Sequence, residues 1–225
     1  MNKNYLLSLL VVFSMCYGTI AQTDYRNEQQ VTAALNSIAS KGGAKAKLTS
    51  LVKTAGGKDI WMLTLSDGNP ESHPGIAIMG GVQGDHLLGT ELAIHMAENI
   101  VTNHPEVLKK TTFYIFPNLS PDATAQYFAA TKFARHGNAT KTDDDRDGQT
   151  NEDGFEDLNG DGIITMMRIE DPTGVYKMLE EDNRVMVMSD PNKGERGTYN
   201  LLTEGMDNDK DGDFNEDGLG GVAFN

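Results

Sequence analysis

The feature that most constrains this chain is an acidic stretch at residues 142–165, TDDDRDGQTNEDGFEDLNGDGIIT, which holds nine Asp and Glu residues against one Arg. It recurs, because residues 207–218 match residues 143–154 at eight of twelve positions, and a partial third copy occupies residues 157–165. Like charges at this density repel one another and keep a chain solvated and open. The stretch is therefore either a solvated spacer or a segment that folds around cations.

The spacing inside each copy favours cations, because it follows the pattern D-x-[DN]-x-[DN]-G of calcium loops. In such a loop the first, third and fifth side chains face one centre, Gly permits the sharp turn, and the ninth position adds a side chain or a water. The bidentate Glu of the twelfth position is absent here, and Glu152 with Asp153, or Glu216 with Asp217, are its possible replacements. The alternative is a turn-rich loop without an ion. The predicted calcium ligands are Asp143, Asp145, Asp147 and Asn151 in the first copy, Asp157, Asn159 and Asp161 in the middle copy, and Asp207, Asp209, Asp211 and Asn215 in the last copy.

Charge and the N-terminal residues indicate an exported protein. The formal net charge of −14 argues against nucleic acid and anionic membranes as partners. Lys3, the apolar run YLLSLLVVF and the small residues of TIA predict a signal peptide over residues 1–21, and hence a secreted or periplasmic protein with no membrane attachment after cleavage. The single cysteine, Cys16, lies in this segment, so ions rather than disulfides would have to brace the mature chain.

Hydrophobic periodicity predicts alternating helices and strands before residue 137. We expect helices at 26–38, 87–101 and 123–134, with Leu88, Leu92, Met96 and Ile100 on one side of the second. We expect strands at 59–66, at 75–81 in a buried position, and at 111–117. This order predicts an α/β layered domain over residues 22–136. Residues 137–225 are acidic, rich in Gly and Asp, and without clear periodicity.

Three segments of the first half carry a resemblance to a known family. They are GGKDIWMLTLSDG (56–68), GGVQGDHLLGTELAIHMAENI (80–100), and FPNLSPDATAQYF with the later RHGN (116–138). Together they resemble the zinc carboxypeptidases, the carboxypeptidase A-like metallopeptidases, and the acidic segments resemble an insertion of a secreted bacterial branch. The resemblance implies a three-layer α/β fold with a mixed sheet, a zinc cofactor, and a peptide or protein substrate.

The resemblance also assigns roles to particular residues. Gln83 and His86 stand where the family has the His and Glu of its H-x-x-E zinc motif, so they are the candidate zinc ligands, although a neutral amide is not a usual one. Arg135, thirteen residues after Asp122, stands where the family has the Arg that polarises the scissile carbonyl. An ordinary surface Arg and a polar loop His are the alternatives. Of the other histidines, only His136 has a suggestive position, next to Arg135.

The final residues, GGVAFN, resemble the start of the family's NRNF motif and make Asn225 a candidate substrate-binding residue. The third zinc ligand and the catalytic Glu would follow it, so we expect an N-terminal part of a longer peptidase, with a sheet incomplete at its C-terminus and no activity alone. The favoured function is a secreted zinc metallocarboxypeptidase-like protein. The alternative is a non-catalytic, calcium-stabilised peptide- or ligand-binding protein on the same scaffold.

Overall fold

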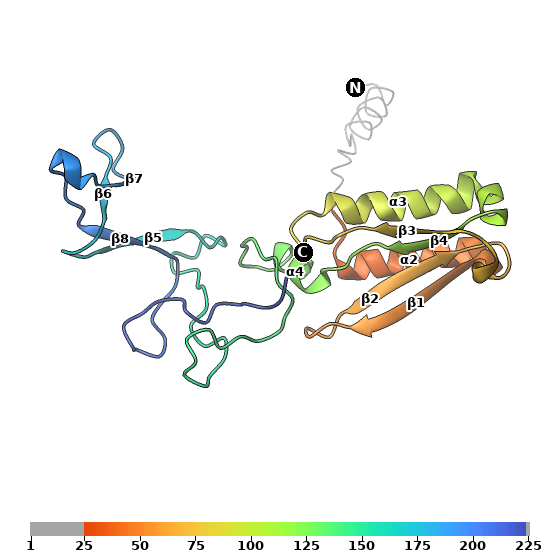
Figure 1. Ribbon diagram of the computed structural model, residues 1–225, viewed down its shortest axis with the longest axis horizontal. Coiled ribbons are helices and arrows are strands. Elements are labelled where there is room, and N and C mark those ends of the chain that lie inside the picture. Colours follow the sequence, from red (N-terminus) through yellow and green to blue (C-terminus); the bar gives the residue numbers. More distant parts are fainter. Residues whose placement is uncertain (1–24, 224–225) are drawn as a thin grey trace, which may run out of the picture.

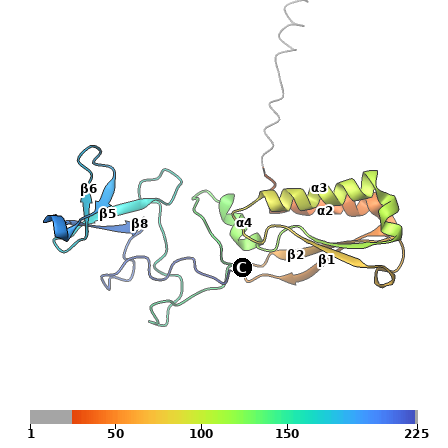
Figure 2. The ribbon, with the colours of Figure 1, turned by 45° about the horizontal axis from the view of Figure 1, so that its top comes forward.

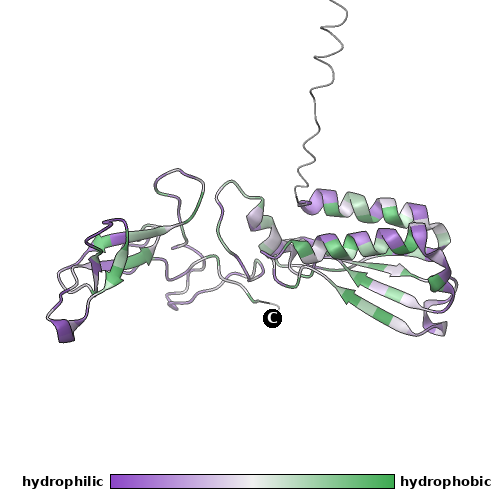
Figure 3. Cartoon of the chain, turned by 90° about the horizontal axis from the view of Figure 1, so that it is seen from above, coloured by the Kyte–Doolittle hydropathy of each residue, from purple (hydrophilic) through white to green (hydrophobic). Residues whose placement is uncertain are grey.

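The computed structural model describes residues 25–223, so the predicted signal peptide and Asn225 lie outside the described residues. Figure 1 shows two folded regions, an α/β layer and a smaller sheet, with long loops between them. Hydropathy separates these parts, since apolar segments concentrate in the helices and strands and the connecting loops are mostly polar (Figure 3). No helix within residues 25–223 is both long enough and apolar enough to cross a bilayer.

The first helix, α2 (Glu28–Gly42), begins at a capping box. The side chain of Asn27 accepts from the backbone of Gln30, and the Gln30 side chain accepts from the Asn27 backbone, which satisfies two otherwise unpaired N–H groups. Its buried stripe of Val31, Leu35 and Ile38 has helical spacing. The predicted helix is confirmed, and it extends to Gly42.

The first sheet is mixed, as expected. Its strands are β1 (Ala46–Lys53), β2 (Asp59–Leu65), β3 (Gly75–Met79) and β4 (Thr112–Phe116), in the order β1-β2-β4-β3. β1–β2 and β2–β4 are antiparallel and β3–β4 is parallel. Helix α3 (Leu88–Asn103) joins α2 on one face of this sheet (Figure 2). No helix among residues 25–223 covers the opposite face, so two of the three expected layers are seen here.

The core lies between the two long helices and this sheet. Leu63, Leu65 and Ile115 from the sheet, with Leu35 and Ile94 from the helices, are 0 or 1% exposed. Each of these residues comes from a segment that the periodicity predicted correctly as helix or strand. Burial of this apolar area supplies the main favourable free energy of folding for this half of the chain.

The predicted burial of strand 75–81 is wrong. Strand β3 is an edge strand, and Ile76 and Met79 are 46% and 61% exposed, because only β4 pairs with it. On α3, Leu88, Leu92 and Met96 are exposed. The buried stripe of the helix is Thr90, Ala93, Ile94, Ala97 and Ile100, so Ile100 is buried while the other three residues predicted on its side are exposed.

Helix α4 (Pro121–Tyr127) is shorter than the predicted helix at 123–134. The chain leaves the helix because Lys132 pairs with the middle acidic copy. The N–H of Lys132 donates to Gly162 O at 2.9 Å, and the N–H of Ile164 donates to Lys132 O at 3.0 Å. A contact thirty residues ahead thus overrides the local helical pattern.

A second sheet, which the sequence did not reveal, follows the first two acidic copies. Its strands are β5 (Met166–Glu170), β6 (Tyr176–Met178), β7 (Met186–Met188) and β8 (Tyr199–Thr203), all antiparallel in the order β5-β8-β6-β7. The remaining elements are 3₁₀ turns at Gly43–Lys45, Pro70–Ser72, Pro105–Lys109 and Pro191–Lys193. Strands of three to five residues are too short to give a clear period of two.

Replacing Leu63 tests whether the α/β layer is held by this core. Leu63→Ala should lower the free energy of unfolding by about 2 to 5 kcal/mol, because it removes buried methyl groups and leaves a cavity. Leu92→Ala, on the exposed side of α3, should change it by less than about 0.5 kcal/mol. Urea titration of both variants measures the difference. Equal losses would contradict this assignment of the core.

Candidate metal and substrate sites

The joint between β3 and α3 carries the residues that the zinc motif singled out. A Cβ on Gly80 would lie 2.5 Å from Gly89 O, and one on Gly84 would lie 2.2 Å from the Cβ of Ala123. Only glycine fits this close approach of backbone to neighbour. Ser120 fixes the same loop, since its Oγ donates to Val82 O at 2.6 Å. The loop that presents Gln83 and His86 is therefore seated on the start of α4.

Gln83 lies beside residues that the motif comparison did not include. Its side-chain amide nitrogen is 3.4 Å from Nδ1 of His136, and the same Nδ1 is 3.6 Å from Oδ1 of Asp85. His86 is exposed, and its backbone N–H donates to Gln83 O at 3.1 Å. Sequence reasoning noted His136 and missed Asp85, because no spacing rule connects residues about fifty positions apart.

The donors at this joint are too few to make a zinc site by themselves. Zinc takes three protein donors in catalytic sites and four in structural ones, usually imidazole, thiolate or carboxylate. Within residues 25–223, every group of three or more such side chains with ligand atoms gathered together lies in the acidic loops, not here. Asp85 and His136 supply one carboxylate and one imidazole, and His86 adds a second imidazole on the same loop. The described residues therefore do not complete a zinc donor set.

Arg135 is held next to a buried carboxylate. Asp122, 2% exposed, accepts from Thr54 Oγ1 at 2.7 Å, from the N–H of Ala139 at 2.9 Å and from the N–H of Gly56 at 3.3 Å. Arg135 donates through Nε to Gly137 O at 3.2 Å and through a terminal nitrogen to Asn138 O at 2.6 Å. Burial lowers the pKa of Arg135, and the charge of Asp122 acts in the opposite direction. A guanidinium has five N–H groups, and these bonds use two of them.

The two outer acidic copies fold alike. Corresponding residues take the same left-handed backbone conformations, and the pairs of φ angles are Arg146 73° and Lys210 71°, Gly148 98° and Gly212 110°, and Asn151 58° and Asn215 61°. In both copies the carboxylate at the third position accepts the N–H two residues on, from Asp147 to Asp145 at 3.0 Å and from Asp211 to Asp209 at 3.2 Å. The sequence repeat is therefore also a structural repeat.

Three buried acids connect these loops to one another. Asp217 of the last copy accepts the N–H groups of Asp144 and Asp145 in the first copy. In return, Asp153 of the first copy accepts the N–H groups of Asn208 and Asn215 in the last copy.

Glu204, directly after β8, accepts backbone N–H groups of the middle copy in the same way. It accepts from the N–H groups of Leu158 at 2.9 Å and Asn159 at 3.1 Å. Asp153, Glu204 and Asp217 are all less than 5% exposed, so each loop is closed by a carboxylate from elsewhere in the chain.

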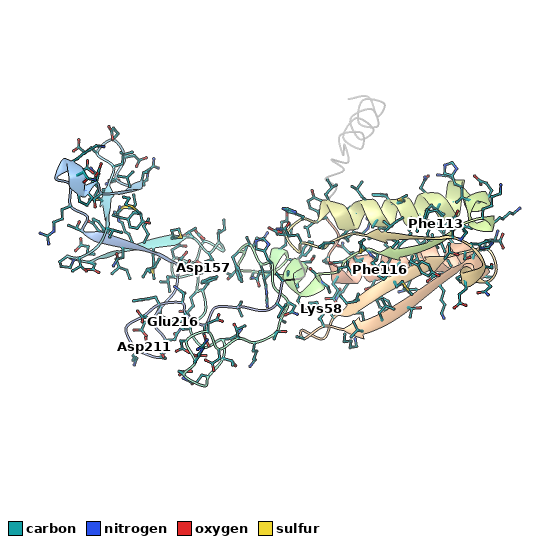
Figure 4. All side chains as sticks on the ribbon, viewed as in Figure 1. Lys58, Phe113, Phe116, Asp157, Asp211 and Glu216 are labelled. Carbon is teal, nitrogen blue, oxygen red and sulfur yellow. The ribbon has the colours of Figure 1, made fainter. Side chains whose placement is uncertain are left out.

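The exchange brings the first and last copies face to face. Figure 4 shows Asp211 and Glu216 in the loop region between the two folded parts, with Asp157 nearby. Burial raises the pKa of the Glu216 carboxyl to about 7, and burial followed by the charge of Asp217 raises the pKa of Glu152. Ligand oxygens within 4.8 Å of one another occur in four groups: Asp143, Asp145 and Asp147; Asp145, Asp209 and Asp211; Asp145, Glu152 and Asp217; and Asp211, Asp213 and Glu216.

The predicted calcium ligands divide into two sets. Asp143, Asp145, Asp147, Asp209 and Asp211 belong to these gathered groups. In the second set of predicted ligands, the side-chain oxygens accept backbone N–H groups of their own loops. These residues are Asp157, Asn159, Asp161, Asp207 and Asn151. The side-chain amide of Asn215 donates to Thr203 O at 2.9 Å. Glu152, Glu216 and Asp217, the possible replacements for the twelfth-position Glu, also join the groups. Asp213 joins them without having been predicted.

Sequence comparison identifies a family and relatives of this chain. The family model described as zinc carboxypeptidase matches residues 31–161, more than half of the chain. Carboxypeptidase M of Mus musculus is 26% identical over 108 residues, which cover 44% of this chain and 24% of that protein. Carboxypeptidase D of Anas platyrhynchos is 29% identical over 161 residues, which cover 66% of this chain and 11% of that protein. The chain thus spans a quarter or less of the length of these two relatives.

Solved structures with similar folds include carboxypeptidase A of Helicoverpa armigera. It has a TM-score of 0.48 and 15% identity, over 62% of this chain and 37% of that one. Bovine thrombin-activatable fibrinolysis inhibitor, in complex with tick carboxypeptidase inhibitor, has a TM-score of 0.48 and 11% identity, over 58% of this chain and 43% of that one.

Replacing Asp122 tests whether it organises the surroundings of Arg135. Asp122→Ala leaves three donors without an acceptor and the buried guanidinium without its neighbouring charge, so the free energy of unfolding should fall by about 1 to 3 kcal/mol or more. Asp67→Ala breaks only a partly exposed ion pair with Lys45 and should cost less than about 1 kcal/mol. Urea denaturation measures both. Equal effects would rule out an organising role for Asp122.

Proposed function

Because this chain belongs to the zinc carboxypeptidase family, we propose that it forms part of a secreted metallopeptidase that hydrolyses peptide bonds. The observation that supports this best is the glycine-seated loop between β3 and α3, with the half-buried cation of Arg135 near the same end of the α/β layer. We assign the α/β peptidase part to residues 22–136 and the acidic insertion to residues 137–225. The substrate is a peptide or protein, and Asn225 contributes to its binding.

Zinc is the cofactor, and it would polarise the peptide carbonyl and activate a water. On this chain we assign His86 as the main donor, because imidazole binds zinc directly, and Gln83 as a weak or water-mediated one. Arg135 would donate from its remaining N–H groups to the oxyanion that develops on the substrate carbonyl. Thr54, Gly56 and Ala139 hold the Asp122 carboxylate that acts on this guanidinium.

A non-catalytic ligand-binding protein on the same scaffold is the second candidate. The neutral amide of Gln83 at the first ligand position favours it, as does the occupation of two Arg135 nitrogens by backbone carbonyls. Such a protein would bind peptides through the same surface and would not need zinc. The two candidates therefore differ in metal content and in turnover, and both can be measured on one preparation.

Kinetics of the protein expressed from its complete reading frame test the peptidase proposal. We expect hydrolysis of a peptide panel that a zinc chelator abolishes, and Arg135→Ala should lower kcat/KM by about 10²- to 10³-fold, as loss of an oxyanion donor does. Arg184→Ala, on an exposed arginine paired with Asp182, should leave the rate unchanged. The 225-residue chain alone should be inactive, because its described residues do not complete the zinc donors.

Zinc content of the same preparations tests the donors independently of turnover. His86→Ala should purify without zinc, whereas Gln83→Ala should retain part of it. If wild type binds peptides but contains no zinc and hydrolyses nothing, the ligand-binding function replaces the peptidase.

We also propose that calcium stabilises the protein through the acidic loops. The support is the gathering of carboxylates from the first and last copies, where the ligand oxygens of Asp145, Asp209 and Asp211 lie within 4.8 Å of one another. A ligand that binds only the folded state raises the melting temperature by mass action. Thermal melts in calcium should therefore give a higher midpoint than melts in chelator, and Asp209→Ala should reduce the shift. Identical midpoints with and without calcium would exclude this stabilisation.

A further inference from the structure

Asp145, Glu152 and Asp217 come together at the contact between the first and last acidic copies. Their ligand oxygens all lie within 4.8 Å of one another. Two of these residues belong to the first copy, and the third comes from the last copy, more than sixty positions away. The loop pattern does not account for this group, because in a calcium loop all protein ligands come from one copy.

Asp217 provides an independent reason to expect a ligand there. Its side chain is 1% exposed. Oδ1 accepts the N–H groups of Asp144 and Asp145, but Oδ2 is buried and has no hydrogen-bond partner in residues 25–223. Oε2 of Glu152 is likewise buried and unpartnered. Buried carboxylate oxygens are normally hydrogen-bonded or coordinated, and here the nearest groups are more carboxylates.

We propose that Asp145, Glu152 and Asp217 form a divalent-cation site, shared between the two outer copies, that takes calcium. All three side chains offer only oxygen, which calcium prefers, and no nitrogen or sulfur donor for zinc belongs to the group. The Glu missing from the twelfth position of the first copy is thereby replaced by an acid of the last copy. This inference rests on the calcium binding proposed above and assigns the residues that carry it.

The shared ion would hold together the two ends of the segment that contains the second sheet. The segment between Asp153 and Asp217 contains the whole second sheet, β5 to β8. The reciprocal hydrogen bonds of Asp153 and Asp217 already bring its two ends together, and the ion would offset the repulsion that this proximity creates. Calcium would thus fix where the second sheet leaves and rejoins the chain.

Calcium titration of the chain tests the site, with affinity and stoichiometry measured by calorimetry. Glu152→Gln is the main variant. Because Oε2 of Glu152 has no hydrogen-bond partner in residues 25–223, the substitution at that atom removes no hydrogen bond. Asp217→Asn is the second, since an amide oxygen can still accept from Asp144 and Asp145. Glu180→Gln, an exposed acid between β6 and β7, is the matched control. Each site variant should lose one bound calcium or at least tenfold in affinity, and the control should match wild type.

Stability without metal separates ligation from a structural role. In chelator, Glu152→Gln should melt at or above the wild-type temperature, because it removes one of three repelling charges, and in calcium it should melt below wild type. Wild-type calcium binding that both site variants retain in full would overturn the shared site and leave calcium binding elsewhere in the loops intact. A wild type that binds no calcium would overturn both proposals.

Discussion

The acidic half of the molecule depends on one constraint, which is that carboxylates crowded in the sequence must each find positive charge or donor groups in the fold. The structure meets part of this need with backbone. Asp153, Glu204 and Asp217 are buried, and each accepts N–H groups from a loop elsewhere in the chain. Because the first and last copies exchange these acids reciprocally, their carboxylates also face one another, and this excess of charge is what a cation would neutralise.

The α/β half also contains one buried carboxylate that accepts hydrogen bonds from segments distant in sequence. Asp122 is the only buried acid among residues 25–136, and it connects the turn at Thr54–Gly56 with Ala139. Arg135 donates to Gly137 O and Asn138 O, next to Ala139, so the Asp122 network anchors the segment that holds this guanidinium. A cation held in this way is pre-organised, which is the property that the oxyanion role proposed for Arg135 requires.

The sequence predicted the elements whose side chains follow a clear period and whose contacts are local. Helix α2, strands β2 and β4, and the mixed α/β class were predicted correctly, because Val31, Leu35, Leu63 and Ile115 lie on single buried faces. The burial of β3 was predicted wrongly, since a strand's place at a sheet edge depends on tertiary packing. The strands of the second sheet are too short to show a pattern.

For the candidate sites too, the sequence predicted the local patterns but not the contacts that depend on tertiary packing. The repeat predicted which acids belong to calcium-type loops, but not that Asp217 reaches the first copy or Asp153 the last, because no local rule encodes an exchange between copies. Gln83 and His86 stood out through a motif, whereas the proximity of His136 to Gln83 and Asp85 depends on the path that the chain takes after α4.

Backbone hydrogen exchange at Asp144, Asp145 and Asn208 tests the central claim most directly, since these amides donate to the exchanged carboxylates. If cations hold the loops together, all three amides should be protected in calcium and should lose protection together in chelator, while the amides of β2 and β4 stay protected in both. Exchange at these three positions that is equally fast, or equally slow, in calcium and in chelator would contradict the account.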